Sequence, residues 1–200
     1  MLQEAVIRTP KHSLKIECHY DIIDINKVKT NKELFAKMCK DGCRNFNKKH
    51  SCPPSVLDFK NYTNGYNKLL VVLLRIHLNQ LGEYRQYHRL RIGNAVIKPR
   101  IEKIMRLLED NSKFLGTGAC RLCKPCKKAL NQPCKYPSKM RFSLESLGVD
   151  CNQLTEDAFH FPLLWYKDKT APEYTSVVCA LPVNENNLKQ AEKAIIKVMG

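Results

Sequence analysis

Cysteine is the residue type with the most chemistry to offer in this sequence, and four of the ten cysteines lie within fifteen residues. Three of these four follow one another at C-x2-C spacing, which is typical of iron–sulfur cluster loops because each thiolate can bind a different iron of a compact cube. A zinc site usually separates its ligand pairs by a longer insert, so zinc is the less favoured alternative. We call this set the C-terminal thiol group: Cys120, Cys123, Cys126 and Cys134.

A second and looser set of thiols precedes it in the chain with C-x3-C-x8-C spacing. Its last cysteine is followed by Pro53-Pro54, which fixes the backbone there and cannot continue a helix. We call this set the N-terminal thiol group: Cys39, Cys43 and Cys52. The two groups define cysteine loops at residues 39–54 and 116–137, and all seven thiols are predicted metal ligands.

Seven thiols are one short of the eight that two complete Cys₄ clusters need, and three ligand assignments remain open. In the preferred one, the C-terminal group holds a complete 4Fe–4S cluster and the N-terminal group holds a second cluster with one iron open. In another, Cys134 completes the N-terminal group, as in two-cluster ferredoxins whose fourth cysteine binds the other cluster. In the third, there is one cluster only. Of the six histidines, only His50 is an alternative fourth ligand, because it lies beside Cys52 in the sequence. A solvent-exposed position in the loop is favoured for it.

The remaining cysteines fit the protein core better than a metal site. Cys18 and Cys179 lie in strand-like segments among apolar neighbours, where a free cysteine behaves as a small hydrophobe. Cys151 is harder to assign, because it follows a short helix that lies close to the cysteine loop in sequence.

The elements that must position these thiols follow from hydrophobic periodicity. Strands are predicted at residues 14–20, 68–76 and 174–181, with a short one at 113–115. Helices are predicted near 31–42, 55–62, 83–92, 101–108, 143–148, 150–158 and 184–199, with Pro99 entering or kinking the fourth. This order predicts a single α/β or α+β domain over residues 1–200, with a small mixed sheet flanked by helices.

Composition and charge indicate the class of binding partner and the cellular compartment of the protein. The formal net charge is +15, and no acidic residue occurs between Asn111 and Leu144, which favours an acidic redox partner or an anionic small-molecule substrate. Nucleic acid is a less favoured partner because aromatic residues are not interleaved with these cations. The longest apolar run is too short to span a membrane. Ten cysteines without a recognisable export signal predict a cytoplasmic protein with reduced thiols.

Three passages of the chain resemble a prokaryotic family described only as predicted metal-binding proteins, a domain of unknown function. They are the N-terminal thiol group with its prolines, the C-terminal group with Gly116 and Gly118 before it, and residues 141–150, R-F-S-L-E-S-L-G-V-D. The last departs from the family pattern at Phe142 and Ser146. The resemblance implies metal binding, as iron–sulfur in anaerobic or redox metabolism, and it implies no particular reaction.

The sequence therefore predicts an iron–sulfur protein with one or two 4Fe–4S clusters that transfers electrons. An enzyme that uses an open cluster iron for sulfur or reductive chemistry on a small molecule is one alternative. A zinc-stabilised basic module that binds nucleic acid or protein is another.

Overall fold

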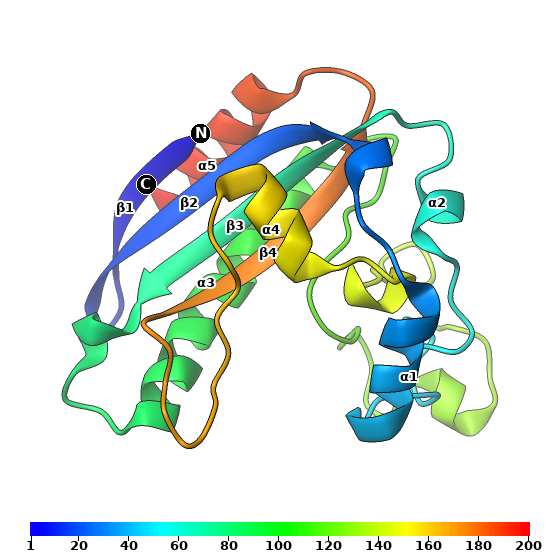
Figure 1. Cartoon of the computed structure of the whole chain (residues 1–200), viewed down its shortest axis with the longest axis horizontal. Coiled ribbons are helices and arrows are strands. Elements are labelled where there is room, and N and C mark those ends of the chain that lie inside the picture. The colour runs from blue at the N-terminus through cyan, green and yellow to red at the C-terminus, as the bar shows by residue number, and fades with distance from the viewer.

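The computed structural model describes residues 1–200 and contains one four-stranded sheet in the order β1-β2-β3-β4 (Figure 1). The strands are β1 Leu2–Arg8, β2 Ser13–Asp24, β3 Lys68–His77 and β4 Tyr174–Val183. Every neighbouring pair is antiparallel, so the predicted α+β class is confirmed but the prediction of a mixed sheet is wrong. A parallel pair needs a crossover between adjacent strands, whereas here each strand meets its sequence neighbour.

Five α-helices surround the sheet, joined by four single-turn 3-10 helices. The α-helices are α1 Lys32–Gly42, α2 Phe59–Tyr62, α3 Gln86–Leu108, α4 Cys151–Phe159 and α5 Leu188–Met199. The 3-10 helices are η1 Ile25–Lys27, η2 Leu78–Leu81, η3 Lys127–Leu130 and η4 Glu145–Leu147.

The sheet separates two hydrophobic layers, and β3 contributes to both. Leu70, Val72, Leu74 and Ile76 face α3 and α5, while Leu69, Val71 and Leu73 face α4 and η4. This explains why the apolar run of β3 has no polar alternation: both of its faces are covered, as the sequence predicted. None of the seven predicted metal ligands belongs to either layer.

Several boundaries differ from the sequence prediction. Strand β1 was not predicted, because its alternating pattern is short and its residues are mostly exposed at the sheet edge. Helix α3 runs through Pro99 as one element, held there by the buried Val96, Ile97 and Ile101 on its inner face. The predicted strand at 113–115 reduces to one bridge between Leu115 and Ala180.

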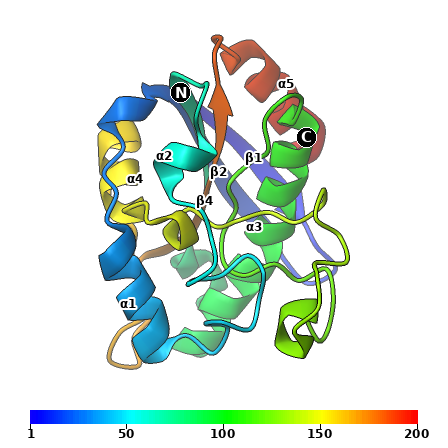
Figure 2. The same ribbon diagram turned by 90° about the vertical axis from the view of Figure 1, so that its right-hand side faces the viewer.

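Both cysteine loops lie together beside α1, on the side of the sheet that faces the viewer in Figure 2. Helix α1 has no buried residue of its own, so it depends on an anchor elsewhere. The anchor is a short antiparallel contact between the chain before α1 and the Gly148 turn: the Asn31 N–H donates to the Gly148 carbonyl at 2.7 Å, and the Asp150 N–H donates to the Lys29 carbonyl at 3.0 Å. None of the helices is long and apolar enough to cross a membrane.

Candidate metal centre

The N-terminal thiol group is built at the end of α1. The side chain of Asn31 caps the start of this helix by accepting from the Leu34 N–H, and the Cys43 N–H closes its last turn on the Cys39 carbonyl at 3.0 Å. This turn places Cys39 and Cys43 on neighbouring positions of one helix end. Cys52 returns from the following loop and is 8% exposed.

These three thiols share one environment. The pKa of Cys52 is raised to about 11, by burial first and then by the neighbouring Cys43 and Cys39. The pKa of Cys39 is likewise raised, by burial first and then by Cys43 and Glu145. Metal binding requires the thiolate forms, so a cation here would relieve this mutual repulsion and release protons.

The C-terminal thiol group lies on a loop that begins after Gly118 and runs through η3 to Cys134. Gly118 has φ +69°, a left-handed conformation that favours glycine, and leads directly into Ala119 and Cys120. Burial raises the pKa of Cys120, and Cys123, Cys134 and Cys126 each add to that rise. All four thiols of this group therefore lie within electrostatic range of one another. Cys134 returns to its own group and does not contribute to the pKa shifts of Cys39 or Cys52.

Cys126 differs from the other thiols because its environment favours the anion. Burial alone would raise its pKa, but backbone N–H groups of His50 and Lys128, together with the charge of Lys49, lower it on balance. The Cys123 thiol also donates to it. Backbone N–H donors to cysteine sulfur are among the features by which proteins set the potential of iron–sulfur clusters.

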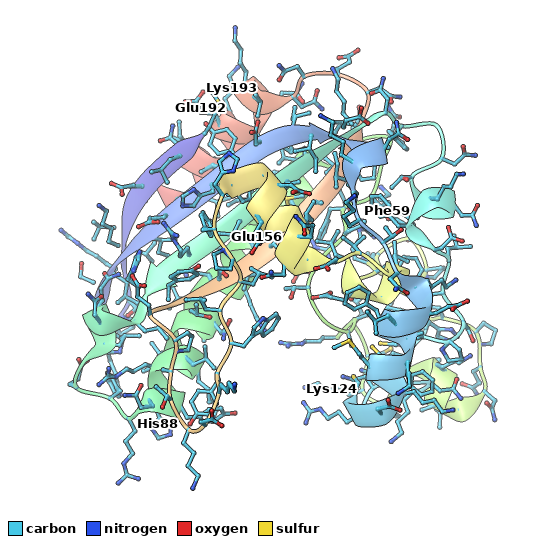
Figure 3. The ribbon with its side chains drawn as sticks, in the orientation of Figure 1. Phe59, His88, Lys124, Glu156, Glu192 and Lys193 are labelled. Carbon is cyan, nitrogen blue, oxygen red and sulfur yellow. The ribbon has the colours of Figure 1, made fainter.

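The two thiol groups are joined by direct hydrogen bonds between their loops. The Cys120 N–H donates to Ser51 Oγ at 3.0 Å, and Lys49 Nζ donates to the Cys120 carbonyl at 3.3 Å. On the other side, Lys128 Nζ donates to Ser55 Oγ at 3.2 Å. Ser51 is 1% exposed, so the first of these contacts is fully shielded from water. In Figure 3, sulfur atoms gather between α1 and the loop that carries Lys124.

His50 does not lie with the N-terminal thiols as a further ligand. Its Nε2 contacts the Gln132 carbonyl at 2.9 Å, so the ring spans the gap between the two loops. A carboxylate, Glu145, lies beside this thiol group, near enough to raise the pKa of Cys39. In the sequence, Glu145 stands out only as part of the segment 141–150. Its position near Cys39 could not be predicted, because η4 and α1 are far apart in the chain.

The donor set was compared with the two metal centres that the sequence suggested. Four thiolates on one zinc would lie about 3.8 Å apart, given Zn–S bonds of about 2.3 Å in a tetrahedron. No group of three or more His, Cys, Asp and Glu side chains is arranged to hold a single ion. A cluster spreads its ligands over several irons. Neighbouring thiols with N–H donors beside them suit either kind of metal centre.

The three other cysteines lie in the protein interior. Cys18 and Cys179 are 0% and 1% exposed, as predicted, and burial raises both of their pKa values far above the ordinary thiol range. Cys151, which the sequence left unassigned, is 6% exposed at the start of α4 and donates to the Val149 carbonyl at 3.9 Å. All ten cysteines are free thiols.

A buried ion pair fixes the segment that carries the C-terminal thiol group. Glu109 follows α3, and Arg141 follows the cysteine loop; both side chains are 9% exposed. Arg141 Nη2 donates to Glu109 Oε2 at 2.5 Å, and its Nε donates to Oε1. Burial alone would raise the pKa of Glu109, but these bonds and the Phe114 N–H lower it on balance. The pair joins residues 32 positions apart and closes the loop at its base.

The fold and the site together define a class: an α+β domain whose candidate metal-binding thiols lie in two adjoining loops outside its hydrophobic layers. The chain belongs to the family of predicted metal-binding proteins (DUF2284), whose model matches residues 21–180 and so covers both thiol groups, the end of β2, all of β3 and most of β4. No curated protein and no solved structure shows detectable similarity to the chain. Membership in the family expected from the sequence is thereby confirmed.

Proposed function

We propose that the protein is an iron–sulfur electron carrier with two 4Fe–4S clusters. The C-terminal thiol group would hold one cluster through four thiolates, and the N-terminal thiol group would hold the other through three. When bound, such clusters accept and release single electrons. The observation that carries this assignment is the position of Cys134, which follows the C-x2-C-x2-C run in the same loop and lies near enough to Cys120 to raise the pKa of that thiol.

The surroundings of the C-terminal group support a redox role. Peptide N–H groups and Lys49 stabilise negative charge on Cys126, and the loop surface carries further cations. Positive charge near a cluster stabilises its more negative reduced form and raises its potential. The exposed cations also favour docking of an acidic partner protein: Arg121, Lys124, Lys135 and Lys139.

The contacts between the loops support electron transfer within the molecule. The Cys120 N–H donates to Ser51 Oγ and the Cys120 carbonyl accepts from Lys49 Nζ, so side chains of one loop are joined to the backbone of a predicted ligand in the other. Two centres held this way would be neighbours and would exchange electrons before a partner does. The ten unpaired thiols favour a reducing compartment such as the cytoplasm.

The test is anaerobic reconstitution with iron and sulfide, followed by metal analysis of matched variants. The intact chain is expected to bind about eight iron and eight sulfide, and Cys123→Ser or Cys43→Ser should each lose about half of that iron. Cys18→Ala is the control, because it removes a thiol from the core without touching either loop. A colourless protein with stoichiometric zinc would overturn the proposal, and full iron retention by Cys43→Ser would overturn the second cluster.

A second candidate function rests on the three-thiol count of the N-terminal group. Three cysteines leave one iron of a cubane without a cysteine ligand, and an open iron can act as a Lewis acid toward a substrate. Glu145 is the acidic side chain that acts on Cys39. The discriminating measurement is the EPR spectrum of the reduced protein with and without added cyanide. A changed spectrum favours the open site, whereas an unchanged one favours electron transfer alone.

A further inference from the structure

A cavity of about 340 Å³ lies between α3, the edge of β4 and the segment 163–166. It is continuous in its lining with a second cavity that extends to Cys120 and Leu122, because Lys98 and Thr117 line both. The hollow therefore runs from the C-terminal thiol loop along α3. In Figure 3, His88 marks the N-terminal part of α3 and Lys124 marks the thiol loop. Its size lies within the range of pockets that hold small molecules.

One wall is a row of α3 side chains that changes from apolar to cationic. Leu90, Asn94 and Lys98 are spaced four residues apart, so they lie on one face of the helix. Lys98 forms no ion pair: no carboxylate oxygen approaches its Nζ within 4.0 Å. Burial and the nearby Arg121 lower its pKa, and Glu145 only partly opposes them. A second negative group would therefore stabilise this ammonium.

A second wall offers unpaired backbone groups at the edge of the sheet. Leu115 and Ala180 exchange both hydrogen bonds, at 2.7 and 3.0 Å, so the backbone of Ala180 faces away from β3. Because this direction repeats every second residue, the N–H and C=O groups of Val178 and Ser176 face the same way, into the cavity. No hydrogen bond from another segment reaches them, although Val178 is 6% exposed. Buried backbone groups are almost always paired, which points to a missing partner.

The third wall is apolar and aromatic. Trp165 and Tyr166 belong to it, and Trp165 is 70% exposed even though it is the only tryptophan in the chain. Tyr166 is held by Tyr87 of α3, with ring centroids 5.5 Å apart in an edge-to-face contact. Exposed aromatic rings beside a cavity are a common way to bind the apolar body of a ligand. The rest of the wall is aliphatic: Leu163, Leu164 and Val178.

We propose that this cavity is a binding site for a small carboxylic acid with an apolar body. Lys98 and the free N–H groups of Ser176 and Val178 would bind the carboxylate, and the wall around Trp165 would bind the apolar part. Charge-assisted hydrogen bonds to a carboxylate are the strongest contacts such a pocket offers. The proposal does not depend on the metal content of the thiol groups, although the cavity reaches Cys120.

The single tryptophan makes occupancy directly measurable. Fluorescence of Trp165 is followed while the full chain is titrated with butanoate, octanoate and phenylacetate, and with the neutral phenylacetamide. Octanoate or phenylacetate should give a saturable change, with phenylacetamide at least about tenfold weaker, because it lacks the charge that Lys98 recognises. Lys98→Gln should remove this preference, and Lys103→Gln, an exposed lysine on the same helix, should retain it.

A second readout tests the backbone groups independently of the lysine. In amide NMR spectra with phenylacetate, the Ser176 and Val178 signals should shift with the same saturation curve as the fluorescence. The proposal is overturned if no carboxylate gives a saturable change, if Lys98→Gln binds as tightly as the unaltered chain, or if the shifting amides lie elsewhere. A negative result in the fluorescence and NMR titrations says nothing about iron content. The carboxylate site can therefore be refuted while the proposed function stands, and the reverse.

Discussion

Replacement of Glu109 by glutamine tests whether the ion pair at the base of the thiol loop holds that loop in place. The side chains of Glu109 and Arg141 are each 9% exposed and share two hydrogen bonds. Removing one partner from a buried pair typically costs about 3–5 kcal/mol, because the other charge is left uncompensated. Glutamine keeps one acceptor for Arg141, so we expect a loss near about 3 kcal/mol in the free energy of unfolding.

The assay is urea unfolding of the metal-free chain under reducing conditions, with Glu102→Gln as the matched control. Glu102 also pairs with an arginine near the end of α3, but that pair is 56% and 37% exposed. An exposed pair of this kind contributes at most about 1 kcal/mol. Equal losses for the two variants, or a loss below about 1 kcal/mol for Glu109→Gln, would refute the reasoning.

The same pair predicts a pH dependence with a definite sign. The folded pKa of Glu109 is below its ordinary value of 4.5, so its stabilisation is complete above pH 4.5 and is lost as pH falls through the folded pKa. The stability difference between the unaltered chain and Glu109→Gln should therefore shrink in acid. A difference that stays constant from neutral pH to below 4.5 would contradict the assignment.

Two further substitutions probe the elements around the site. Gly148→Ala should cost about 2 kcal/mol or more and lower iron binding at the N-terminal thiol group, because φ is +88° and a Cβ would lie 2.7 Å from the Lys32 Cα. Gly65→Ala, at the same φ with nothing within 4 Å, is the control and should keep full iron content. His19→Gln should reduce the loss of stability in mild acid: burial lowers the pKa of His19 below 6.5, so the folded state resists a proton that the unfolded chain accepts below pH 6.5. Unfolding free energies measured against pH, with the exposed His88→Gln as control, would contradict this if the two variants behave alike.

Much of the fold could be predicted from local sequence patterns. The unbroken apolar run of β3 predicted a strand covered on both faces, and the helix predicted near 31–42 corresponds to α1, which Asn31 caps. Strand β1 could not be predicted in the same way, because its pairing with β2 supplies the stability that its mostly exposed side chains do not. Pro99 led to the prediction of two separate helices where the structure has the single helix α3. Burial of the inner face of α3 outweighs the one backbone hydrogen bond that the proline removes.

The thiol groups could be identified from spacing, but their surroundings could not. Ser51, Lys49 and Glu145 act on cysteines that are far from them in sequence, so no local pattern reveals them. The role proposed for Lys98 could not be predicted from the sequence, where it is one of several basic residues on the same helix. Only the fold brings Thr117 and β4 to the cavity that Lys98 lines. The prediction of His50 as an exposed loop residue was incomplete for the same reason: its ring contacts a carbonyl 82 positions away.

The exclusion of all seven candidate ligands from the hydrophobic layers bears on how the protein matures. Both layers can form while the thiol loops are still empty, since their contacts come from the sheet, from α2 to α5, from η4 and from loop residues that flank the thiol loops. Folding would then precede metal delivery, and a chain stripped of metal by oxygen would keep its scaffold and be repaired in place. After oxidative loss of the proposed clusters, the cell would need to supply only new iron and sulfide and would not need to synthesise a new polypeptide.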